Sequence, residues 1–276
     1  MNTSNIRYFI VIFLILIAGC KEGRVPQERS FSGRLDAIPQ AKWDVLAEKR
    51  IFFGHQSVGQ NIMSGVGDVM QSNPAIKLDI RETSRPEDFE KPVFAHARIG
   101  ENMNPKSKID HFRRIMEGGV GRRADIAFFK LCYVDVDRMT DVEALFRYYD
   151  EAMTYLTREF PNLKIITVTV PLTISSAGIK AEIKRMLGRS LPVQDDNVKR
   201  NVFNEMMRKR YGASVFDLAG SEATMPDGGK AFFTKGNETF YALNPAFSDD
   251  GGHLNKAGQN VVATGLLCFL ADLCNK

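Results

Sequence analysis

The strongest constraint on the fold is an alternation of segments that begins near residue 50 and runs to the C-terminus. Short apolar segments, typical of buried strands, are separated by segments whose apolar residues recur at helical spacing. This alternation predicts a parallel sheet with helices on both faces. We therefore expect a three-layer α/β/α sandwich around a central parallel sheet of about five strands. The predicted strands are 50–53, 77–81, 125–133, 164–170 and 213–218, and the predicted helices are 58–72, 108–116, 142–160, 197–211 and 256–273.

The first 19 residues are predicted to be a signal peptide. Arg7 precedes an apolar run that is too short to favour a spanning helix. Residues 16–20, Leu-Ile-Ala-Gly-Cys, resemble a bacterial lipobox, which implies cleavage before Cys20 and diacylglycerol on its thiol. An ordinary signal peptide and an N-terminal anchor helix are the alternatives. We expect residues 20–42 to carry the lipid and form a tether, and 43–276 to be one domain, lipid-anchored in the bacterial cell envelope and facing the periplasm or exterior.

Composition narrows the partners of this domain. The full chain has 37 Lys and Arg against 33 Asp and Glu, a net charge of +4, so no nucleic-acid partner is expected. Basic pairs such as Lys199-Arg200 are expected on solvated helix faces. No CxxC pair or histidine cluster suggests a metal, and no cofactor is expected. Cys132 is expected to be buried and inert, whereas the six-residue spacing of Cys268 and Cys274 leaves their pairing open.

Two long segments interrupt the alternation. Residues 173–192 follow the fourth predicted strand and could cover a site at its end. Residues 221–247 are rich in glycine and aromatic residues and lead directly into the sequence around Asp250. Because loops of this length in a compact domain are usually functional or disordered, we expect the second segment to form a wall that faces the substrate.

Ser57, together with Asp250 and His253 almost 200 residues later, could form one catalytic triad. Ser57 follows the first predicted strand, at the edge where open parallel sheets bind ligands. His253 could take the serine proton, and Asp250, three residues before it, could fix the tautomer of that histidine. Asp249 is the alternative acid. Ser57 also suits the start of a helix, whose dipole would favour a nucleophile there.

The chain resembles the SGNH (GDSL-like) hydrolase superfamily over most of residues 48–275. The resemblance rests on the sequences Phe-Phe-Gly-His-Gln-Ser-Val-Gly at 52–59, Arg-Ile-Gly-Glu-Asn at 98–102, and Asp-Gly-Gly-His-Leu-Asn with Gly258 at 250–258. It implies a flavodoxin-like fold, an ester hydrolase with a triad of Ser57, His253 and Asp250, and an oxyanion hole that uses the backbone N–H groups of Ser57 and Gly100.

The sequence departs from the family pattern at two places. His55 and Gln56 stand where the family has Gly-Asp, and Val134-Asp135 stands where it has Asn-Asp. Valine cannot replace the asparagine as a hydrogen-bond donor to the oxyanion, and the loss of one donor costs about 3–4 kcal/mol. Either a substitute exists or activity has been lost. The candidate substitutes are Asn102, which is favoured because it lies beside Gly100, and Tyr133, Lys130 and His55.

Two of these candidates also have structural explanations. His55 is expected to be a core or supporting histidine. Lys130 lies inside an apolar strand, and a buried lysine needs a carboxylate partner or a lowered pKa. We therefore expect it to pair with Asp135 or Asp217, or else to face the active site.

Together these features predict a serine esterase that removes acetyl or other short acyl groups from a glycan. Its expected partners are an acylated glycan or other small ester and, through the lipid on Cys20, a membrane. Alternatives on the same fold are a glycan O-acetyltransferase, a lipase-like esterase and an inactive carbohydrate-binding module.

Overall fold

The computed structural model of the chain describes residues 34–175, 192–225 and 227–274. The predicted signal peptide, Cys20 and the first part of the tether lie outside these residues, as does most of the 173–192 segment. Within the described ranges, no helix is long and apolar enough to cross a membrane.

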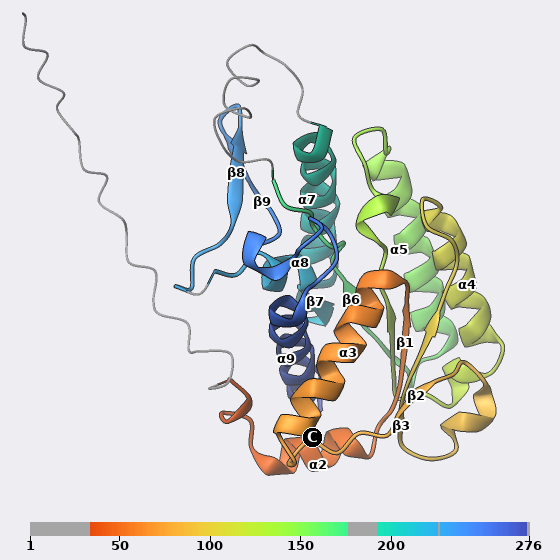
Figure 1. Cartoon of the computed structure of the whole chain (residues 1–276). Coiled ribbons are helices and arrows are strands. Elements are labelled where there is room, and N and C mark those ends of the chain that lie inside the picture. The colour runs from red at the N-terminus through yellow and green to blue at the C-terminus, as the bar shows by residue number, and fades with distance from the viewer. Residues whose placement is uncertain (1–33, 176–191, 226, 275–276) are drawn as a thin grey trace, which may run out of the picture.

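A parallel sheet lies at the centre of the fold. Its strands are β1 (Arg50–His55), β2 (Ile80–Glu82), β3 (Val93–Arg98), β4 (Ile126–Phe129) and β5 (Lys164–Ile165). They are hydrogen-bonded in the order β2-β3-β1-β4-β5, and every neighbouring pair is parallel (Figure 1). This arrangement confirms the predicted central parallel sheet of about five strands.

A further parallel pair follows β5. It consists of β6 (Thr167–Val168) and β7 (Val215–Phe216). Between β5 and β6, Ile166 N donates to Ala127 O of β4 at 3.1 Å, so the chain keeps its hydrogen bonding to the sheet as it passes from one strand to the next. The predicted strand 164–170 is therefore present as two short strands.

Helices cover both faces of the sheet. Side chains alternate between the faces along a strand, and Phe53 joins one apolar cluster while Phe52 joins the other. The helices are α2 (Gln40–Ala47), α3 (Ser57–Ser72) and α9 (Lys256–Leu273) on the Phe53 face, and α4 (Pro105–Glu117), α5 (Val142–Glu159) and α7 (Pro192–Tyr211) on the Phe52 face (Figure 1). The three layers are those that the sequence predicts.

The short helical elements lie mostly in connections. They are α8 (Leu218–Glu222), which follows β7, and the 3-10 turns η1 (Pro86–Phe89), η2 (Val120–Arg122), η3 (Tyr133–Asp135), η4 (Gly212–Ser214) and η5 (Pro245–Phe247).

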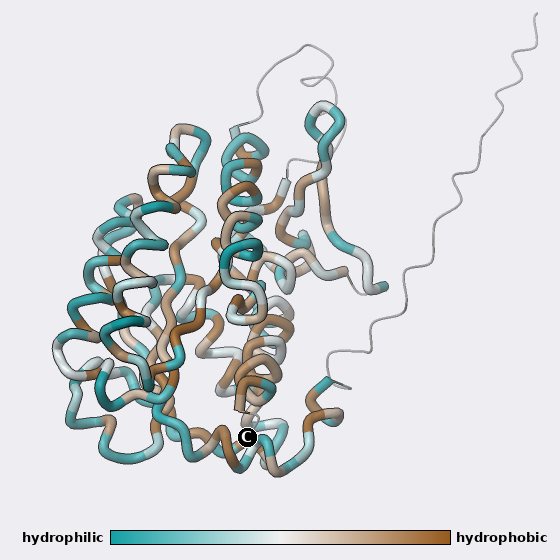
Figure 2. The backbone as a smooth tube through the Cα atoms, turned by 180° about the vertical axis from the view of Figure 1, so that it is seen from behind, coloured by the Kyte–Doolittle hydropathy of each residue, from teal (hydrophilic) through white to brown (hydrophobic). Residues whose placement is uncertain are grey.

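Helix α9 is buried on nearly all sides. Residues 262–268 are consecutively buried, which a helix lying on the surface cannot achieve. Its apolar character appears in Figure 2, where α9 and the central strands are coloured largely hydrophobic. Gly65 of α3 allows the close approach of the two helices, because a Cβ at this position would lie 2.4 Å from Gln259 O. Since α3 begins at Ser57 and α9 follows His253, this packing brings the two predicted catalytic segments to one region.

The structure differs from the sequence prediction at several elements. Strand β3, a neighbour of β1 in the sheet, was not predicted. The 221–247 segment contains an antiparallel hairpin of β8 (Phe232–Lys235) and β9 (Glu238–Tyr241). At the N-terminal side, Leu35 and Trp43 are buried in the core, so packing begins before the expected boundary at residue 43. Cys132, Cys268 and Cys274 are all buried and free.

Candidate active site

The ends of β1, β3 and β4 bring three predicted site segments to one edge of the sheet. Ile99, which follows β3, donates its N–H to His55 O at the end of β1 (3.0 Å). On the other side of β1, Lys130 N donates to Gly54 O (3.1 Å). Ser57, the loop of residues 100–104 and the turn η3 therefore emerge side by side, at the carboxyl ends of parallel strands where ligands bind.

Ser57 is the first residue of α3. Gln56 before it is extended, and its side-chain amide donates to Ile99 O (2.9 Å) and Gly100 O (2.8 Å). The amide thus fixes the start of α3 to the loop that follows β3. Among the hydrogen bonds of the described residues, none uses the Ser57 N–H, so this N–H remains free at the positive end of the helix dipole.

Asp250 and His253 form the strongest part of the predicted constellation. His253 Nδ1 lies 2.7 Å from Asp250 Oδ2, while Asp250 Oδ1 accepts from the N–H groups of Gly252 (2.9 Å) and His253 (2.8 Å). These two N–H groups, together with the imidazole, hold the pKa of the Asp250 carboxyl well below its usual range. Asp249 instead accepts from Asn255 Nδ2 (3.0 Å), so the geometry favours Asp250 as the partner of His253.

The His253 loop is docked against the start of α3. Leu254 N donates to Asn61 Oδ1 (3.3 Å), and Asn61 lies one helical turn beyond Ser57 on the same side of α3. On the C-terminal side, the Asn255 side chain caps α9 by accepting from Gly258 N (3.2 Å). No hydrogen bond joins Ser57 to His253 in this structure; catalytic contacts are often longer when no substrate is bound.

Tyr133 lies beside the histidine. Its ring meets the His253 ring edge-on, with centroids 5.7 Å apart, and a Cβ at Gly252 would lie 2.8 Å from the Tyr133 ring. Burial, and next the charge of Asp250, raises the pKa of Tyr133. Tyr133 therefore contacts the side of the site that the base occupies.

An open pocket of about 470 Å³ adjoins these residues. Within it, Ile174 N donates to Gly251 O (2.9 Å), which ties the segment after β6 to the His253 loop. The lining combines polar and apolar side chains and includes Met103, Tyr133, Val134, Thr173, Arg200 and Asp250.

Arg200 lines the pocket from α7. It was expected on a solvated face, yet it is only 4% exposed, and burial lowers its pKa to about 10. Its guanidinium donates to Tyr133 O (2.9 Å), Val136 O (3.0 Å) and Thr173 Oγ1 (2.8 Å). A signal was present, because Asn197, Arg200 and Asn204 recur at helical spacing as a buried polar stripe of α7.

The Gly100 N–H is already used. Gly100 has a left-handed backbone (φ 53°), and its N–H donates to His111 Nδ1 at 3.0 Å. An oxyanion could accept from this group only after the bond to His111 breaks. The expected donor role of Gly100 therefore does not match the hydrogen bonding seen in this structure.

Lys130 is buried without the predicted carboxylate partner. Its ammonium donates to Leu131 O (3.3 Å) and Cys132 Sγ (3.4 Å). The two expected partners pair elsewhere, Asp135 with Lys108 at 2.5 Å and Asp217 with Arg208 at 2.7 Å. The predicted pairing of Lys130 was wrong because the packing of α4 beside the turn after β4, which the sequence does not reveal, brings Lys108 to Asp135.

His55 is a buried supporting residue. Its Nδ1 lies 3.0 Å from Gln56 O and its Nε2 lies 3.0 Å from His96 Nδ1. The carbonyl can only accept, so His55 Nδ1 carries the proton and His96 donates to His55 Nε2. Both ring nitrogens of His55 are occupied within the protein.

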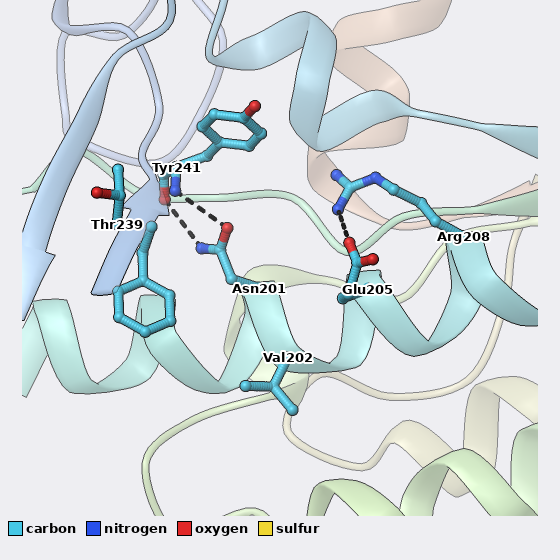
Figure 3. Close-up of a pocket in the computed structure, with 7 residues that line it drawn as sticks. Asn201, Val202, Glu205, Arg208, Thr239 and Tyr241 are labelled. Atoms are coloured by element: carbon cyan, nitrogen blue, oxygen red, sulfur yellow. Dashed lines mark hydrogen bonds and ion pairs between the residues drawn. The ribbon is translucent and has the colours of Figure 1, made fainter. Parts of the chain in front are cut away.

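A second pocket, of about 330 Å³, lies between α7 and β9. Figure 3 shows Asn201 of α7 bonded to the backbone of Tyr241, donating to its carbonyl (2.9 Å) and accepting from its N–H (3.1 Å). Glu205 and Arg208 pair on the same helix at 3.5 Å. None of the predicted catalytic residues lines this pocket. In the described residues, no group of three or more His, Cys, Asp or Glu could hold a metal ion.

Comparison with known proteins gives structural likeness only. No family model and no curated protein sequence matches the chain. Among solved structures, a Streptococcus pneumonia protein assigned as a platelet activating factor is 14% identical and covers 87% of this chain and 94% of its own (TM-score 0.46). A Desulfitobacterium hafniense DCB-2 protein assigned to the lipolytic G-D-S-L family is 9% identical, with coverages of 79% and 97% (TM-score 0.43). The periplasmic domain of the Salmonella ser. Paratyphi A lipopolysaccharide acetyltransferase is 10% identical, with coverages of 85% and 86% (TM-score 0.40).

Proposed function

We propose that this protein is a serine esterase of the SGNH (GDSL-like) type, with Ser57 as nucleophile, His253 as base and Asp250 as the acid that orients it. The observation that carries this proposal is the 2.7 Å contact between His253 Nδ1 and Asp250 Oδ2, in a loop bonded to Asn61 one turn from Ser57. A serine hydroxyl needs such a base, and the base needs an acid that fixes its tautomer.

The proposed reaction has two halves. Ser57 Oγ attacks the ester carbonyl while His253 Nε2 takes the hydroxyl proton, and the carbonyl oxygen becomes an oxyanion. The intermediate collapses, the alcohol leaves with the proton from His253, and the acyl group remains on Ser57. Water then attacks the acyl-enzyme with His253 again as base, which releases the carboxylic acid and restores Ser57. Asp250 stabilises the imidazolium in both halves.

The Ser57 N–H is the first proposed donor to the oxyanion. It has no partner among the described residues and lies at the N-terminus of α3, where the helix dipole favours negative charge. The second donor is not the Gly100 N–H in the arrangement seen here, since His111 accepts from it.

The proposed substrate is a glycan that carries acetyl or other short acyl groups. The expected lipid at Cys20 would hold the enzyme at the cell envelope, which suggests an envelope glycan, and Asp137 and Thr173 supply polar groups beside the apolar residues of the pocket wall. A glycan O-acetyltransferase would use the same first half-reaction and pass the acyl group to a sugar hydroxyl. A lipase-like esterase would need an apolar wall for a long acyl chain.

Hydrolysis of p-nitrophenyl acetate by the full-length protein in detergent tests the proposal. Wild type should release p-nitrophenol, whereas Ser57→Ala should lose nearly all activity, on the order of 10⁶-fold in kcat. A fluorophosphonate probe should label wild type at Ser57, as mapped by mass spectrometry. Equal inactivity of wild type and Ser57→Ala on short esters and acetylated glycans, with glycan binding retained, would instead support a binding module.

Two further measurements separate the enzyme alternatives. A lipase-like esterase should prefer long p-nitrophenyl esters, whereas the proposed enzyme should prefer the acetate. A transferase should move acetyl to an added oligosaccharide faster than it releases free acetate.

A further inference from the structure

The loop of residues 100–104 crosses the carboxyl end of β1, directly beside Ser57. On one side, Gln56 donates to the carbonyls of Ile99 and Gly100 (2.9 and 2.8 Å). On the other side, Met103 N donates to Asp135 Oδ1 (2.9 Å), and Asp135 belongs to the turn that follows β4. Because β1 lies between β3 and β4 in the sheet, the loop that carries Asn102 passes over the end of the strand that leads to Ser57.

A fully buried ion pair fixes this loop. Lys108 of α4 and Asp135 are both 0% exposed in their side chains, and their charged atoms are 2.5 Å apart. Asp135 also accepts from Met103 N and from Cys132 N (2.6 Å), so its two oxygens connect the loop after β3 to the turn after β4. A buried pair of this kind is weak support for stability but can specify one local geometry.

The backbone of the loop is strained where the ion pair holds it. Met103 has φ 64°. In the described part of the chain, it is the only residue besides glycines that has a positive φ. Left-handed backbone at such a residue is uncommon and persists where the surroundings enforce it, often at functional sites. Asp135 supplies that constraint through its bond to Met103 N.

The same lysine orients the amide of Asn102. Lys108 Nζ donates to Asn102 Oδ1 at 3.0 Å. Lysine has no acceptor, so the amide oxygen must face Lys108 and the Nδ2 donors must point elsewhere. The hydrogen bonds of the described residues include none from Asn102 Nδ2, and the residue is exposed, so this donor is open to solvent.

The other candidate donors are less suitable. Lys130 and His55 are fully buried, and their polar atoms are bonded within the protein. The Tyr133 ring lies edge-on to His253, on the side of the base. Val134, in the place where the family pattern has asparagine, lines the same pocket as Met103, the neighbour of Asn102.

We propose that Asn102 Nδ2 is the second oxyanion donor, in place of the asparagine that Val134 replaces, and that Lys108 and Asp135 are positioning residues for it. This inference rests on the proposed esterase function. In this role Asn102 joins Ser57 and His253 as a catalytic residue, because its amide would contact the reacting oxygen. The buried pair acts through Asn102 by fixing which end of the amide faces the substrate.

Asn102→Asp tests the donor without changing the shape of the side chain. Lys108 can still bond to the carboxylate, but the Nδ2 donor is gone. We expect kcat on p-nitrophenyl acetate to fall roughly 100- to 1,000-fold with KM nearly unchanged. The kcat of Asn102→Ala, which adds no charge, should fall by a similar factor. The kcat of the matched neighbour variant Glu101→Gln should stay within about twofold of the wild-type value.

Each outcome of this test bears on a specific claim. An active wild type with both Asn102 variants within twofold of it would overturn the inference and leave the esterase intact. If Tyr133→Phe instead shows the fall in kcat, the donor is Tyr133 and the inference is again overturned. A wild type that is inactive and indistinguishable from Ser57→Ala would overturn the proposed function, and the inference with it.

A double-mutant cycle tests the positioning role of Lys108. Lys108→Met should lower kcat in the wild-type background but have little further effect in Asn102→Asp. Both changes act on the same feature, the oriented Nδ2 donor of Asn102. A merely structural role would lower kcat by the same factor in both backgrounds. Lys108→Met leaves Asp135 buried without a cation and can fail to fold; the Asn102 variants, which keep the ion pair, then decide the proposal alone.

Discussion

Two loops flank Ser57, and both are built on a carboxylate that accepts backbone N–H groups and contacts a basic side chain. In the loop of residues 100–104, the pair is Asp135 and Lys108, each 0% exposed. In the loop of residues 250–253, the pair is Asp250 and His253, exposed by 58% and 41%. The local chemistry is similar, but the burial is opposite.

The difference in burial suits two different tasks. A buried pair cannot change its charge state without a large cost, so it can hold a loop in one strained geometry. An exposed pair contributes little to stability, about 1 kcal/mol or less, but its histidine can exchange protons with substrate and water. We therefore infer that the loop of residues 100–104 is preorganised to bind developing charge, and that the loop of residues 250–253 transfers protons.

Among changes in the two loops, Asp250→Asn should have the largest effect, and it should act mainly on activity. An asparagine cannot hold the histidine in the required tautomer, and we expect kcat to fall about 10⁴-fold on short esters. The free energy of unfolding should change by no more than about 1 kcal/mol, because the pair is exposed. Both quantities can be measured by steady-state kinetics and urea unfolding.

Asp249→Asn is the matched control for this variant. Asp249 contacts Asn255 rather than His253, so its loss should leave kcat within a few-fold of wild type. If the two aspartate variants lost activity equally, Asp250 would not be the orienting acid and the proton-transfer role of this loop would need another basis.

The glycines of the two loops should respond unequally to substitution. Gly100 and Gly251 both have positive φ, 53° and 93°. A Cβ at Gly100 would lie 2.5 Å from the backbone N of Lys108, whereas a Cβ at Gly251 would meet nothing within 4 Å. Gly100→Ala should therefore cost about 3 kcal/mol from steric overlap and backbone strain together, and Gly251→Ala about 1 kcal/mol from strain alone.

Urea unfolding of the two alanine variants checks this difference. If Gly100→Ala is no more destabilising than Gly251→Ala, the loop of residues 100–104 accommodates an added methyl group easily. It is then not the more rigid of the two loops.

The sequence predicts the exposed loop better than the buried one. Asp250 and His253 are three residues apart, so their contact depends on local chain geometry that a short motif encodes. Lys108 and Asp135 are separated by 27 residues and meet only when α4 packs beside the turn after β4. The spacing of Lys108 from Phe112 and Met116 places it on the apolar face of the helix, but nothing in the sequence identifies Asp135 as the partner that makes its burial possible.

A similar distinction holds for the fold. The alternation of strands and helices predicts the three layers because each element carries its own apolar pattern. Strand β3 was missed although Val93, Phe94 and Ala95 form an apolar run, because His96 and Arg98 interrupt the pattern. His96 is only 6% exposed and bonds to His55 of the neighbouring strand, a tertiary contact that makes a polar residue acceptable in the core.

Acid should act mainly on the side of the molecule that holds the 100–104 loop. Burial lowers the pKa of His55 from 6.5 to about 3, and burial also lowers the pKa values of His96 and His111. His111 accepts a hydrogen bond from Gly100 N. His55 of β1 bonds to His96 of β3 and so connects these two neighbouring strands. These contacts require neutral histidines, so they are lost when the rings become protonated.

The sign of the effect follows from the direction of the shift. Because the folded pKa of His55 lies below its unfolded value, the unfolded chain binds more protons as the pH falls below about 6.5. The stability that the neutral ring contributes is complete above pH 6.5 and is lost progressively toward pH 3. His55 alone should remove about 2 kcal/mol from the free energy of unfolding by pH 5. Urea unfolding of wild type and His55→Leu at pH 7.5 and pH 5 measures this loss as the difference between the two proteins. The difference is needed because burial raises the pKa of Glu222 to about 8, so protonation of this carboxyl adds stability in both proteins over the same pH range. His55→Leu should be less stable at pH 7.5, where His96 loses its partner, but should lose less between the two pH values. An equal loss in wild type and His55→Leu would mean that the acid response comes from other groups, and that the buried histidines do not distinguish this side of the site.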